Sequence, residues 1–437
     1  MSETKKDKQF FTVGGVFFLL IVIPLSLMAF LIANGMFKLG VTIKERTVNV
    51  LDNKSQEEIK IRAINTAEEV ANFLNERKKD VLTATILPAN DIAYKQYLKD
   101  NNRNIWIKED GKIKQVAVPL YTDMALIDKS GNEIIKIVNG QTLPAGKLTN
   151  VSKPSSTAYA AEDYFAKAKN LNKGEVYVSP VTGWYVSKSE FEKGKSFSGV
   201  IRFTTPVFGK EGFSGAIVLT LDYRHLARFT NHIVPTQADQ VFKADASTGN
   251  YAYMVDNRGF VIVHPNDFHI QGLAPEGKVV PALTEATSAD LIKKGQEVLN
   301  FHQMGYIDPN LPIIAKDAAA GNAGTKSYKF GGHTIFVAYA PIKFYAASYP
   351  PPAGFGWVGM GIDVEKYNEA ALKASKNIDK EAKAWTATII FILIASMIIL
   401  FFIMWLLVRG INRSLRAEIP DDAQPVYDDD DDDDDDK

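Results

Sequence analysis

The chain has 437 residues, enough for more than one domain, and its 46% apolar content and 30 glycines are typical of a folded protein. It contains no cysteine, which excludes disulfides and thiolate metal sites. The formal charge of −1 hides an asymmetry, because Asp428–Lys437 contribute −8 and residues 1–427 therefore carry +7. This excess is modest and spread out, so we expect no nucleic-acid partner.

Two long uncharged runs predict membrane-spanning helices at residues 10–37 and 384–408. Each run exceeds the roughly 20 residues that a helix needs to cross the hydrocarbon core. A cleaved signal peptide is the rival interpretation of the first run, but its apolar region would be too long, and no small-residue cleavage site follows directly. Basic residues at Lys5–Lys8, before the first run, and at Arg409, after the second, favour cytoplasmic termini. Residues 1–9 would be a short tail, and residues 38–383 would lie outside.

Residues 38–88 are predicted to form a long stalk helix that ends before Pro88. Apolar residues recur at helical spacing and form a single stripe. The stripe consists of Ile59, Ala63, Ala67, Val70, Leu74 and Val81. Such a stripe packs either against the chain's own sheet or against a second copy, and we expect both uses along its length.

A repeated phrase indicates two modules of the same design. "LIDKSGNEI" begins at Leu126 and "MVDNRGFVI" at Met254, and each predicts a β-hairpin whose glycine, Gly131 or Gly259, takes a positive φ. Each hairpin is followed downstream by two further strands, an Asp and a helix. We therefore predict an α+β fold with two modules of the same design, a distal one over residues 89–235 and a membrane-proximal one, with its return helix, over residues 236–383.

This arrangement resembles the double Cache ectodomain of bacterial transmembrane receptors over about residues 10–415, which implies that the two modules are PAS-like and hang from the long helix. The matching phrases include "ALIDKSGNEIIKI", "FTTPVFGKEGFSGAIVLTLD" and "YMVDNRGFVIVHP". The resemblance implies a sensor in the bacterial inner membrane, as in chemoreceptors and sensor histidine kinases. Such a receptor is a homodimer that binds a small molecule, usually in the distal module, and relays the change through its helices to a cytoplasmic output module or signalling partner.

Candidate ligand-binding residues come from the segments expected to surround the distal sheet. They are Tyr121, Asp123, Glu162, Tyr164, Phe165, Tyr177, Trp184, Tyr185 and Arg202, with Lys173 and Ser179 as weaker candidates. Relatives that bind amino acids have an Arg two residues before an aromatic pair, to clamp the carboxylate. Glu162 occupies that position here, which puts an α-amino-acid ligand in doubt. Glu162 and Asp163 instead favour a cation or an amine, unless both are simply solvated helix residues.

Neither a metal nor another cofactor is predicted. The six histidines do not group in the sequence, and the pair "HP" at His264 is interpreted as structural. "GFGWVG" at Gly354 satisfies the dinucleotide-binding pattern but enters a strand rather than a helix, so we expect no enzyme activity from it. No metalloprotease, serine-hydrolase or phosphate-loop motif occurs.

The C-terminal segment is short for a receptor. Residues 409–420 resemble the start of a HAMP linker, and residues 421–437 form an acidic tail predicted to be disordered. The final "DDDDK" equals a protease recognition sequence, so the tail is either an added scar or a native acidic end. The alternative function is a binding or scaffolding protein that displays its domain outside and sends no signal inward.

Overall fold

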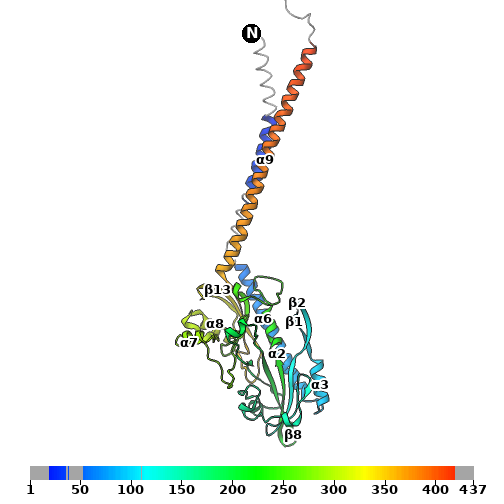
Figure 1. Cartoon of the computed structure of the whole chain (residues 1–437), viewed down its shortest axis with the longest axis vertical. Coiled ribbons are helices and arrows are strands. Elements are labelled where there is room, and N and C mark those ends of the chain that lie inside the picture. Colours follow the sequence, from blue (N-terminus) through cyan, green and yellow to red (C-terminus); the bar gives the residue numbers. More distant parts are fainter. Residues whose placement is uncertain (1–18, 36–37, 39–52, 110, 419–437) are drawn as a thin grey trace, which may run out of the picture. The chain divides into compact units, whose positions relative to one another are not determined.

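The computed structural model describes residues 19–35, 38, 53–109 and 111–418 (Figure 1). The described residues from 53 to 368 form the larger of two compact units, and those up to 38 and from 369 onward form the smaller one. The predicted N-terminal tail, the start of the first span, the first part of the stalk helix and the acidic tail lie outside the described residues.

The larger unit begins with a long helix, α2 (Asn53–Ala84), which contacts both large sheets. The six predicted stripe residues are each at most 5% exposed, so the helical pattern is confirmed from Asn53 onward. They pack against β8 and β9 of one sheet and β13 and β14 of the other, so the stripe is a core for both modules. Its use as a dimer seam stays a prediction.

The first sheet is antiparallel, with strand order β5-β4-β3-β9-β8-β6 and with β7 paired to β8. Its strands are β3 (Tyr121–Asp128), β4 (Glu133–Val138), β5 (Gln141–Thr142), β6 (Tyr177–Val178), β7 (Thr182–Gly183), β8 (Gly199–Gly209) and β9 (Gly212–Asp222).

The second sheet is also antiparallel, in the order β11-β10-β14-β13-β12. Its strands are β10 (Asn250–Asp256), β11 (Val261–Val263), β12 (Gly324–Phe330), β13 (His333–Ile342) and β14 (Gly356–Asp363). Because β11-β10-β14-β13 repeats the arrangement β4-β3-β9-β8, the prediction of two sheets of one design is confirmed.

The repeated phrase builds the same turn twice. Gly131 has φ +90° and Gly259 has φ +86°, as predicted. The Asp that ends the strand accepts a backbone N–H two residues later, from Ser130 to Asp128 at 2.8 Å and from Arg258 to Asp256 at 2.9 Å. The phrase is therefore a structural device, in which the carboxylate satisfies the turn and glycine allows its backbone conformation.

Shorter helices surround the sheets. They are α3 (Asp91–Asp100), α4 (Tyr164–Lys169), α5 (Lys188–Glu192), α6 (Arg224–Asn231), α7 (Ser288–Lys293) and α8 (Asn310–Ala319). The helix α7 is brief and ends before Gly295, whose φ is +67°. The helix α8 was not predicted, and its Pro312 lies in the first turn, where proline is tolerated.

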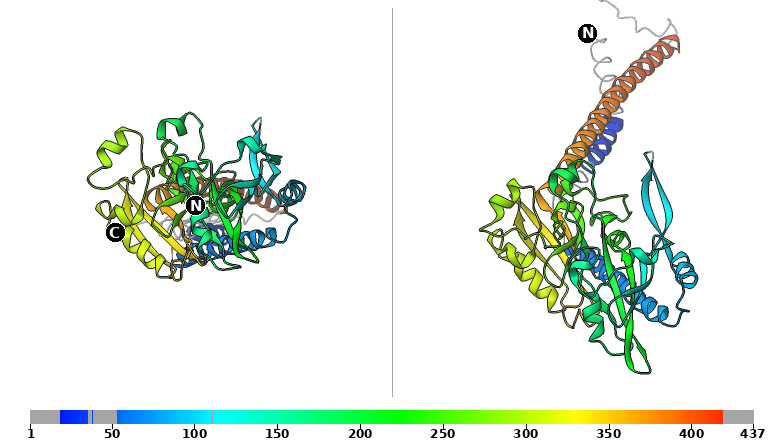
Figure 2. Two further views of the ribbon diagram at one scale, coloured as in Figure 1. Left: turned by 90° about the horizontal axis from the view of Figure 1, so that it is seen from below. Right: turned by 60° about the horizontal axis from the view of Figure 1, so that its bottom comes forward.

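A two-stranded hairpin of β1 (Asn102–Glu109) and β2 (Lys112–Pro119) was also not predicted. In Figure 2 it appears in cyan and stands apart from the two larger sheets.

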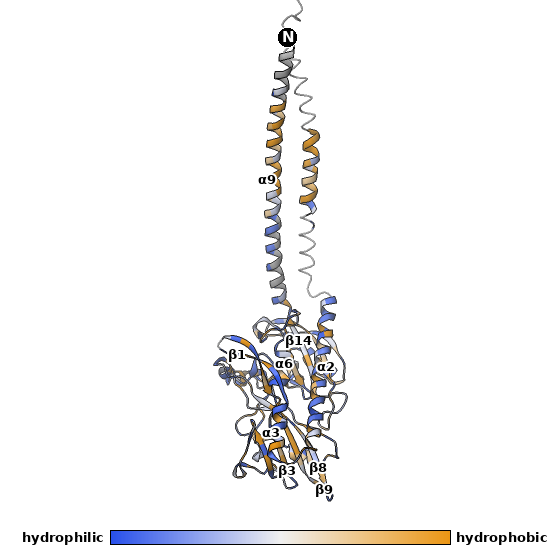
Figure 3. Ribbon diagram, turned by 90° about the vertical axis from the view of Figure 1, so that its right-hand side faces the viewer, coloured by the Kyte–Doolittle hydropathy of each residue, from blue (hydrophilic) through white to orange (hydrophobic). Residues whose placement is uncertain are grey.

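The smaller unit contains two apolar helical segments (Figure 3). The helix α9 (Val364–Glu418) continues directly from β14, and its stretch Lys383–Leu407, with a mean hydropathy of 3.1, is long and apolar enough to cross a membrane. The helix Leu19–Gly35 is apolar but shorter. Length and composition thus support the second predicted span, while the two-pass topology stays a prediction.

Candidate ligand-binding site

The centre of the candidate site is Arg202, in the middle of β8. Alternation along the strand directs Ile201 and Phe203 into the core against α2 and Arg202 to the opposite face of the sheet. Arg202 is only 3% exposed there. A buried guanidinium is unfavourable unless it is paired, and here three other segments supply its partners.

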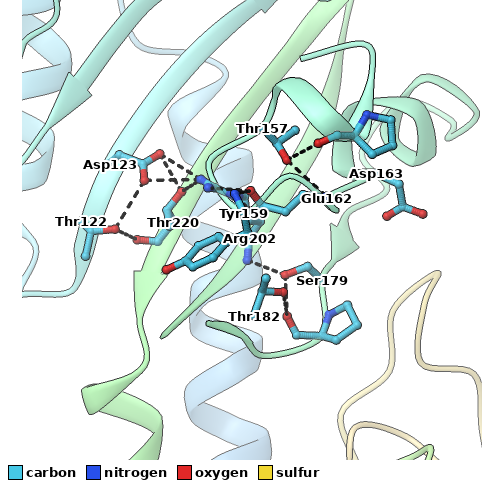
Figure 4. Close-up of polar contacts among 12 residues, drawn as sticks. Thr122, Asp123, Thr157, Tyr159, Glu162, Asp163, Ser179, Thr182, Arg202 and Thr220 are labelled. Carbon is cyan, nitrogen blue, oxygen red and sulfur yellow. Dashed lines mark hydrogen bonds and ion pairs between the residues drawn. The ribbon is translucent and has the colours of Figure 1, made fainter. Parts of the chain in front are cut away.

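Carboxylates flank the guanidinium on two sides (Figure 4). Nε and Nη2 of Arg202 donate to the two carboxylate oxygens of Glu162 at 2.5 and 3.2 Å. Nη1 donates to Asp123 Oδ1 at 3.2 Å and to Thr220 Oγ1 at 2.6 Å. Thr220 in turn donates to Asp123 Oδ1 at 2.7 Å. Asp123, Thr220 and Arg202 form one row across the neighbouring strands β3, β9 and β8.

Tyr164, the first residue of α4, completes the group. Its ring centroid lies 5.0 Å from Cζ of Arg202, a cation–π arrangement. Burial raises the pKa of the Tyr164 hydroxyl, so this side chain is neutral. Burial alone would lower the pKa of Arg202, but Asp123 and Glu162 outweigh it and raise that pKa. We call Asp123, Glu162, Tyr164, Arg202 and Thr220 the Arg202 cluster; two carboxylates around one guanidinium give it a net charge of −1.

Backbone hydrogen bonds fix the cluster in place. Thr157 Oγ1 accepts from the Glu162 N–H at 3.2 Å, and the Tyr159 N–H donates to Glu162 Oε2 at 3.3 Å. On the strand side, Ser179 accepts from the Arg202 N–H through its hydroxyl and donates its own N–H to the Arg202 carbonyl, both at 2.9 Å. The loop before α4 is therefore hydrogen-bonded to Glu162, the residue whose carboxylate it contributes to the cluster.

Four of the nine predicted residues come together in this cluster: Asp123, Glu162, Tyr164 and Arg202. The alternative that Glu162 is a solvated helix residue is wrong, because its side chain is 4% exposed and lies before α4. Thr220 was missed, although it is a lone polar residue inside the apolar run of β9. Tyr159 was missed as well, since no sequence pattern marks its backbone contact.

Two predicted residues face elsewhere in the distal module. Tyr121 lies on the α2 side of the sheet, where its hydroxyl donates to Asp80 Oδ2 at 2.5 Å. The irregularity between β3 and β9 after Tyr121 separates its orientation from that of Asp123. Phe165 packs in the apolar core under α4, with its ring 6.2 Å from that of Phe213. Phe165 is thus a core residue, whereas Tyr121 also lines a separate cavity, together with Leu98 and Asp222. Neither residue shares a pocket with Arg202, and a binding role for Tyr121 stays a prediction.

Tyr177 and Trp184 lie outside the cluster. The Tyr177 hydroxyl donates to Asp163 Oδ1 at 3.0 Å and faces a cleft toward the proximal module. Trp184 is 38% exposed, and its ring lies 5.3 Å from that of Tyr159. Neither side chain has a hydrogen bond or ring contact with Arg202 in the part of the chain that the structure describes, so their assignment to one pocket with it is not supported.

Tyr185 joins the two modules instead of lining a distal pocket. Its hydroxyl lies 3.0 Å from the Phe268 carbonyl and accepts the Glu297 N–H at 2.9 Å. A second junction is formed by Ser348, whose hydroxyl donates to the Val178 carbonyl at 2.6 Å. These contacts position one module against the other.

The histidines require one correction. His264 and His269 do group in space, with ring centroids 4.9 Å apart, and both are buried. The sequence pattern did not group these two histidines. A turn that contains Pro265 brings their rings together in the fold. His225 lies within α6 and His232 caps it, and each contacts a different backbone carbonyl.

One set of potential metal ligands occurs among the described residues: His333, Asp363 and Glu365. Lys366 Nζ lies 3.7 Å from Asp363 Oδ2, and the Thr334 N–H occupies Glu365 Oε2. An ammonium beside the central carboxylate opposes a cation there, so we assign no metal to this set.

A ligand that bound at the cluster would have to replace one of its internal ion pairs. An anion would have to displace Glu162 or Asp123 from Arg202 and leave a buried carboxylate unpaired, which is costly. An ammonium group would instead be attracted by two carboxylates and by the Tyr164 ring. The fold and the site thus define a tandem α+β unit with an acidic, aromatic-lined cluster on the first sheet.

Comparisons with known proteins agree with this class. The model of the Cache domain matches residues 44–365, so the chain belongs to the Cache domain family. A search of curated protein sequences finds no match.

Solved structures similar to this chain are distant. The extracellular domain of vpHK1S-Z8, named as a histidine kinase, is 16% identical, with 75% of this chain and 96% of that chain covered and a TM-score of 0.43. A domain from Vibrio parahaemolyticus assigned to the sensory box/GGDEF family is 16% identical, with coverages of 72% and 98% and a TM-score of 0.44. The ligand-binding domain of the Pseudomonas fluorescens chemoreceptor CtaA, in complex with L-leucine, is 12% identical, with coverages of 72% and 98% and a TM-score of 0.38.

Proposed function

We propose that this protein is a membrane-anchored receptor whose distal Cache module binds a small molecule at the Arg202 cluster. The observation that carries the proposal is the row Asp123–Thr220–Arg202, buried on the sheet face opposite α2 and covered by Glu162 and Tyr164. Buried charge of this kind costs stability, and a binding role accounts for it better than packing does. Catalysis is not part of the proposal.

The ligand carries an amine. The net charge of −1 and the aromatic ring favour a cation or a zwitterion, whose ammonium replaces Arg202 as the partner of one carboxylate. In a zwitterion, the carboxylate of the ligand would pair with the guanidinium that is thereby released. Every buried charge then keeps a partner, which is the condition for exchanging ion pairs in a closed site.

Ligand binding would be relayed through Ser179. Ser179 is hydrogen-bonded to both the backbone N–H and the backbone carbonyl of Arg202, and its own carbonyl accepts the Tyr349 hydroxyl at 3.0 Å. Tyr349 belongs to the loop between β13 and β14, and β14 continues without interruption into α9. A shift of β8 would therefore change the loop that leads to the helix containing the candidate span.

In the proposed topology the two apolar helices anchor the chain in the inner membrane, with both termini in the cytoplasm. Residues 38–383 lie outside, the receptor is a homodimer, and a cytoplasmic partner or output module receives the signal. The support is the apolar stretch Lys383–Leu407, the apolar helix Leu19–Gly35 and the family of the outer domain.

The test is a thermal-shift screen of residues 38–383 against matched pairs of amines and their deaminated acids. At a hundredfold its dissociation constant, a ligand adds roughly 2.7 kcal/mol of stability. We expect amine-bearing compounds to raise the unfolding midpoint, and we expect Asp123→Asn to abolish the shift. Asp163→Asn, which alters an exposed neighbouring carboxylate, is the matched control. Shifts from acids alone would refute the amine assignment, and a flat screen would favour a display role.

A further inference from the structure

The second module contains a cavity beside Tyr251, which corresponds to Asp123 of the Arg202 cluster. In each sheet the strand-ending Asp pairs with a glycine of positive φ: Asp128 with Gly215 and Asp256 with Gly356. Both glycines are required, because a Cβ would lie 2.0 Å from a backbone oxygen of the neighbouring strand. These pairs fix the correspondence between the two sheets residue by residue.

Asp123 lies five residues before Asp128, and Tyr251 lies five residues before Asp256. The correspondence therefore aligns the cross-strand rows that contain these two residues, and one row is charged while the other is uncharged. In the first sheet the row is Asp123–Thr220–Arg202. In the second sheet the equivalent row is Tyr251–Gly361–Val337. The carboxylate, the hydroxyl-bearing side chain and the guanidinium are replaced by a phenol, a hydrogen and an isopropyl group, and Gly361 leaves space beside the aromatic ring.

A cavity of about 30 Å³ lies against Tyr251 of this second row. Its walls include Tyr253, Phe301 and Tyr328, and none of its described lining residues carries a carboxylate, ammonium or guanidinium group. The Tyr253 and Tyr328 hydroxyls are buried side by side, and they interact with each other rather than with a charged group. The volume is enough for one or two water molecules.

Two buried imidazoles supply the polar groups of the cavity. His264 Nδ1 accepts the Asn266 N–H at 2.9 Å, so the proton of its neutral form is on Nε2. His269 Nδ1 lies 2.9 Å from the Glu297 carbonyl and must donate to it, so its Nε2 carries a lone pair. Neither Nε2 has a hydrogen bond to a described residue. Among the residues that line the cavity, the Nε2–H of His264 is therefore a free donor and the Nε2 of His269 a free acceptor. A metal is disfavoured, because His264 would have to lose its Nε2 proton.

We propose that this cavity is a second ligand site, which binds a small uncharged molecule that carries a hydrogen-bond acceptor beside a donor. The ligand accepts from His264 Nε2–H and donates to His269 Nε2, with its apolar surface against the aromatic walls. Tyr251 and Phe330 are the half-buried wall residues, and their displacement makes room for a ligand larger than water. This site is independent of the amine site in the distal module.

Pyrazole is a suitable probe, because it is neutral near pH 7 and its N–H lies beside its acceptor nitrogen. The full chain in lipid nanodiscs is titrated with pyrazole and with 1-methylpyrazole, which lacks the donor, and the unfolding midpoint is recorded. We expect a saturable rise with pyrazole and at least a tenfold weaker effect with 1-methylpyrazole. Equal effects of the two probes, or no saturable shift with pyrazole, would overturn the proposal in the unaltered protein.

Variants then locate the site. His269→Leu removes the acceptor and is expected to abolish the pyrazole shift. Asp123→Asn, in the distal cluster, is expected to retain it. A pyrazole shift that survives His269→Leu or disappears with Asp123→Asn would contradict a site in the second module. Because the probe differs from the amines of the first screen, failure at one site leaves the result at the other intact.

Discussion

At the residue scale, the Arg202 cluster shows how a buried charge can be stable and yet exchangeable. Each side chain in it is paired, and the partners come from β3, β9 and the loop before α4. Removing one member of such a network leaves an unpaired charge in the interior, whereas removing a pair does not. The cluster therefore acts as a unit in stability as well as in binding.

Arg202→Met is expected to destabilise the larger unit by about 3–5 kcal/mol, because Asp123 and Glu162 lose their partner. The double variant Arg202→Met with Glu162→Gln should recover part of this loss. Arg224→Met is the control. It removes an arginine that is also paired with a carboxylate, that of Asp222, but the Arg224 side chain itself is 55% exposed, so the loss should be about 1 kcal/mol or less. Denaturant unfolding measures all three, and equal losses for the two single variants would contradict the account.

Acid is expected to weaken the second module through His264 and His269. Burial lowers the pKa of both imidazoles, and for His264 the neighbouring His269 and Lys243 lower it further, whereas the Glu297 carbonyl and carboxylate act in the opposite direction on His269. The unfolded chain takes up protons near pH 6.5 while the folded chain does not. Stability is therefore complete above about pH 7 and falls below it, by up to about 1.4 kcal/mol per pH unit for each histidine.

The measurement compares unfolding free energies at about pH 7.5 and 5.5 for the unaltered protein and for His264→Leu with His269→Leu. The double variant should lose less stability on acidification. Identical losses would show that other groups control the acid response.

Candidate site residues could be selected from the sequence where a charged side chain was unusual for its neighbours. Arg202 stands in an apolar strand, and Glu162 replaces the Arg of relatives, so both were recognised from the sequence. Their ion pair was not, because 40 residues separate them and only the strand order brings them together. The separation of Tyr121 from Asp123 was not predictable, because an irregularity in the β3–β9 pairing changes the face to which Tyr121 points.

At the element scale, glycine-containing turns define the two modules. Gly259 has φ +86°, and a Cβ added to it would lie 2.4 Å from the His302 ring and 2.8 Å from the Asn300 side chain. Gly140 has φ +77° with nothing within 4 Å. The two positions thus share the backbone requirement and differ in the available space.

Gly259→Ala is expected to cost more than Gly140→Ala. The latter should lose only the conformational advantage of glycine, roughly 1–2 kcal/mol, while the former must also move packed neighbours. Thermal unfolding of the two variants tests this difference. A loss for Gly140→Ala as large as that for Gly259→Ala would show that strain at the turn, rather than packing, determines the effect.

The loop between β13 and β14 is the element that would transmit binding. Tyr349→Phe removes its hydrogen bond to Ser179, and Tyr345→Phe, on the same loop but 38% exposed, is the control. We expect ligand affinity to change less than about threefold in both variants, because neither residue belongs to the cluster. Ligand-induced protection of β14 in hydrogen exchange should be lost only in Tyr349→Phe. Retained protection would place the relay elsewhere.

Elements with strong periodicity were predictable, as the buried stripe of α2 and the two hairpins show. The hairpin β1–β2 and the helix α8 were not. Much of β1 and β2 is exposed, so they lack the alternation of a half-buried strand. In α8, proline near the start obscures a short helix that is stabilised by packing on the second sheet.

At the scale of the whole molecule, one sheet design is used twice with different chemistry on the same face. The first module presents ionised groups and the second presents aromatic rings and neutral imidazoles. The helix α2 packs on the opposite face of both sheets, so neither site competes with the shared core. A receptor built in this way could respond to a charged and an uncharged compound separately.

The most direct test of the central claim is isothermal titration of the larger unit with the best amine from the screen. The account predicts that Asp123→Asn and Tyr164→Leu each weaken binding at least tenfold, while Asp163→Asn leaves the dissociation constant unchanged. Unaltered affinity in both cluster variants would contradict the claim that the Arg202 cluster is the ligand site.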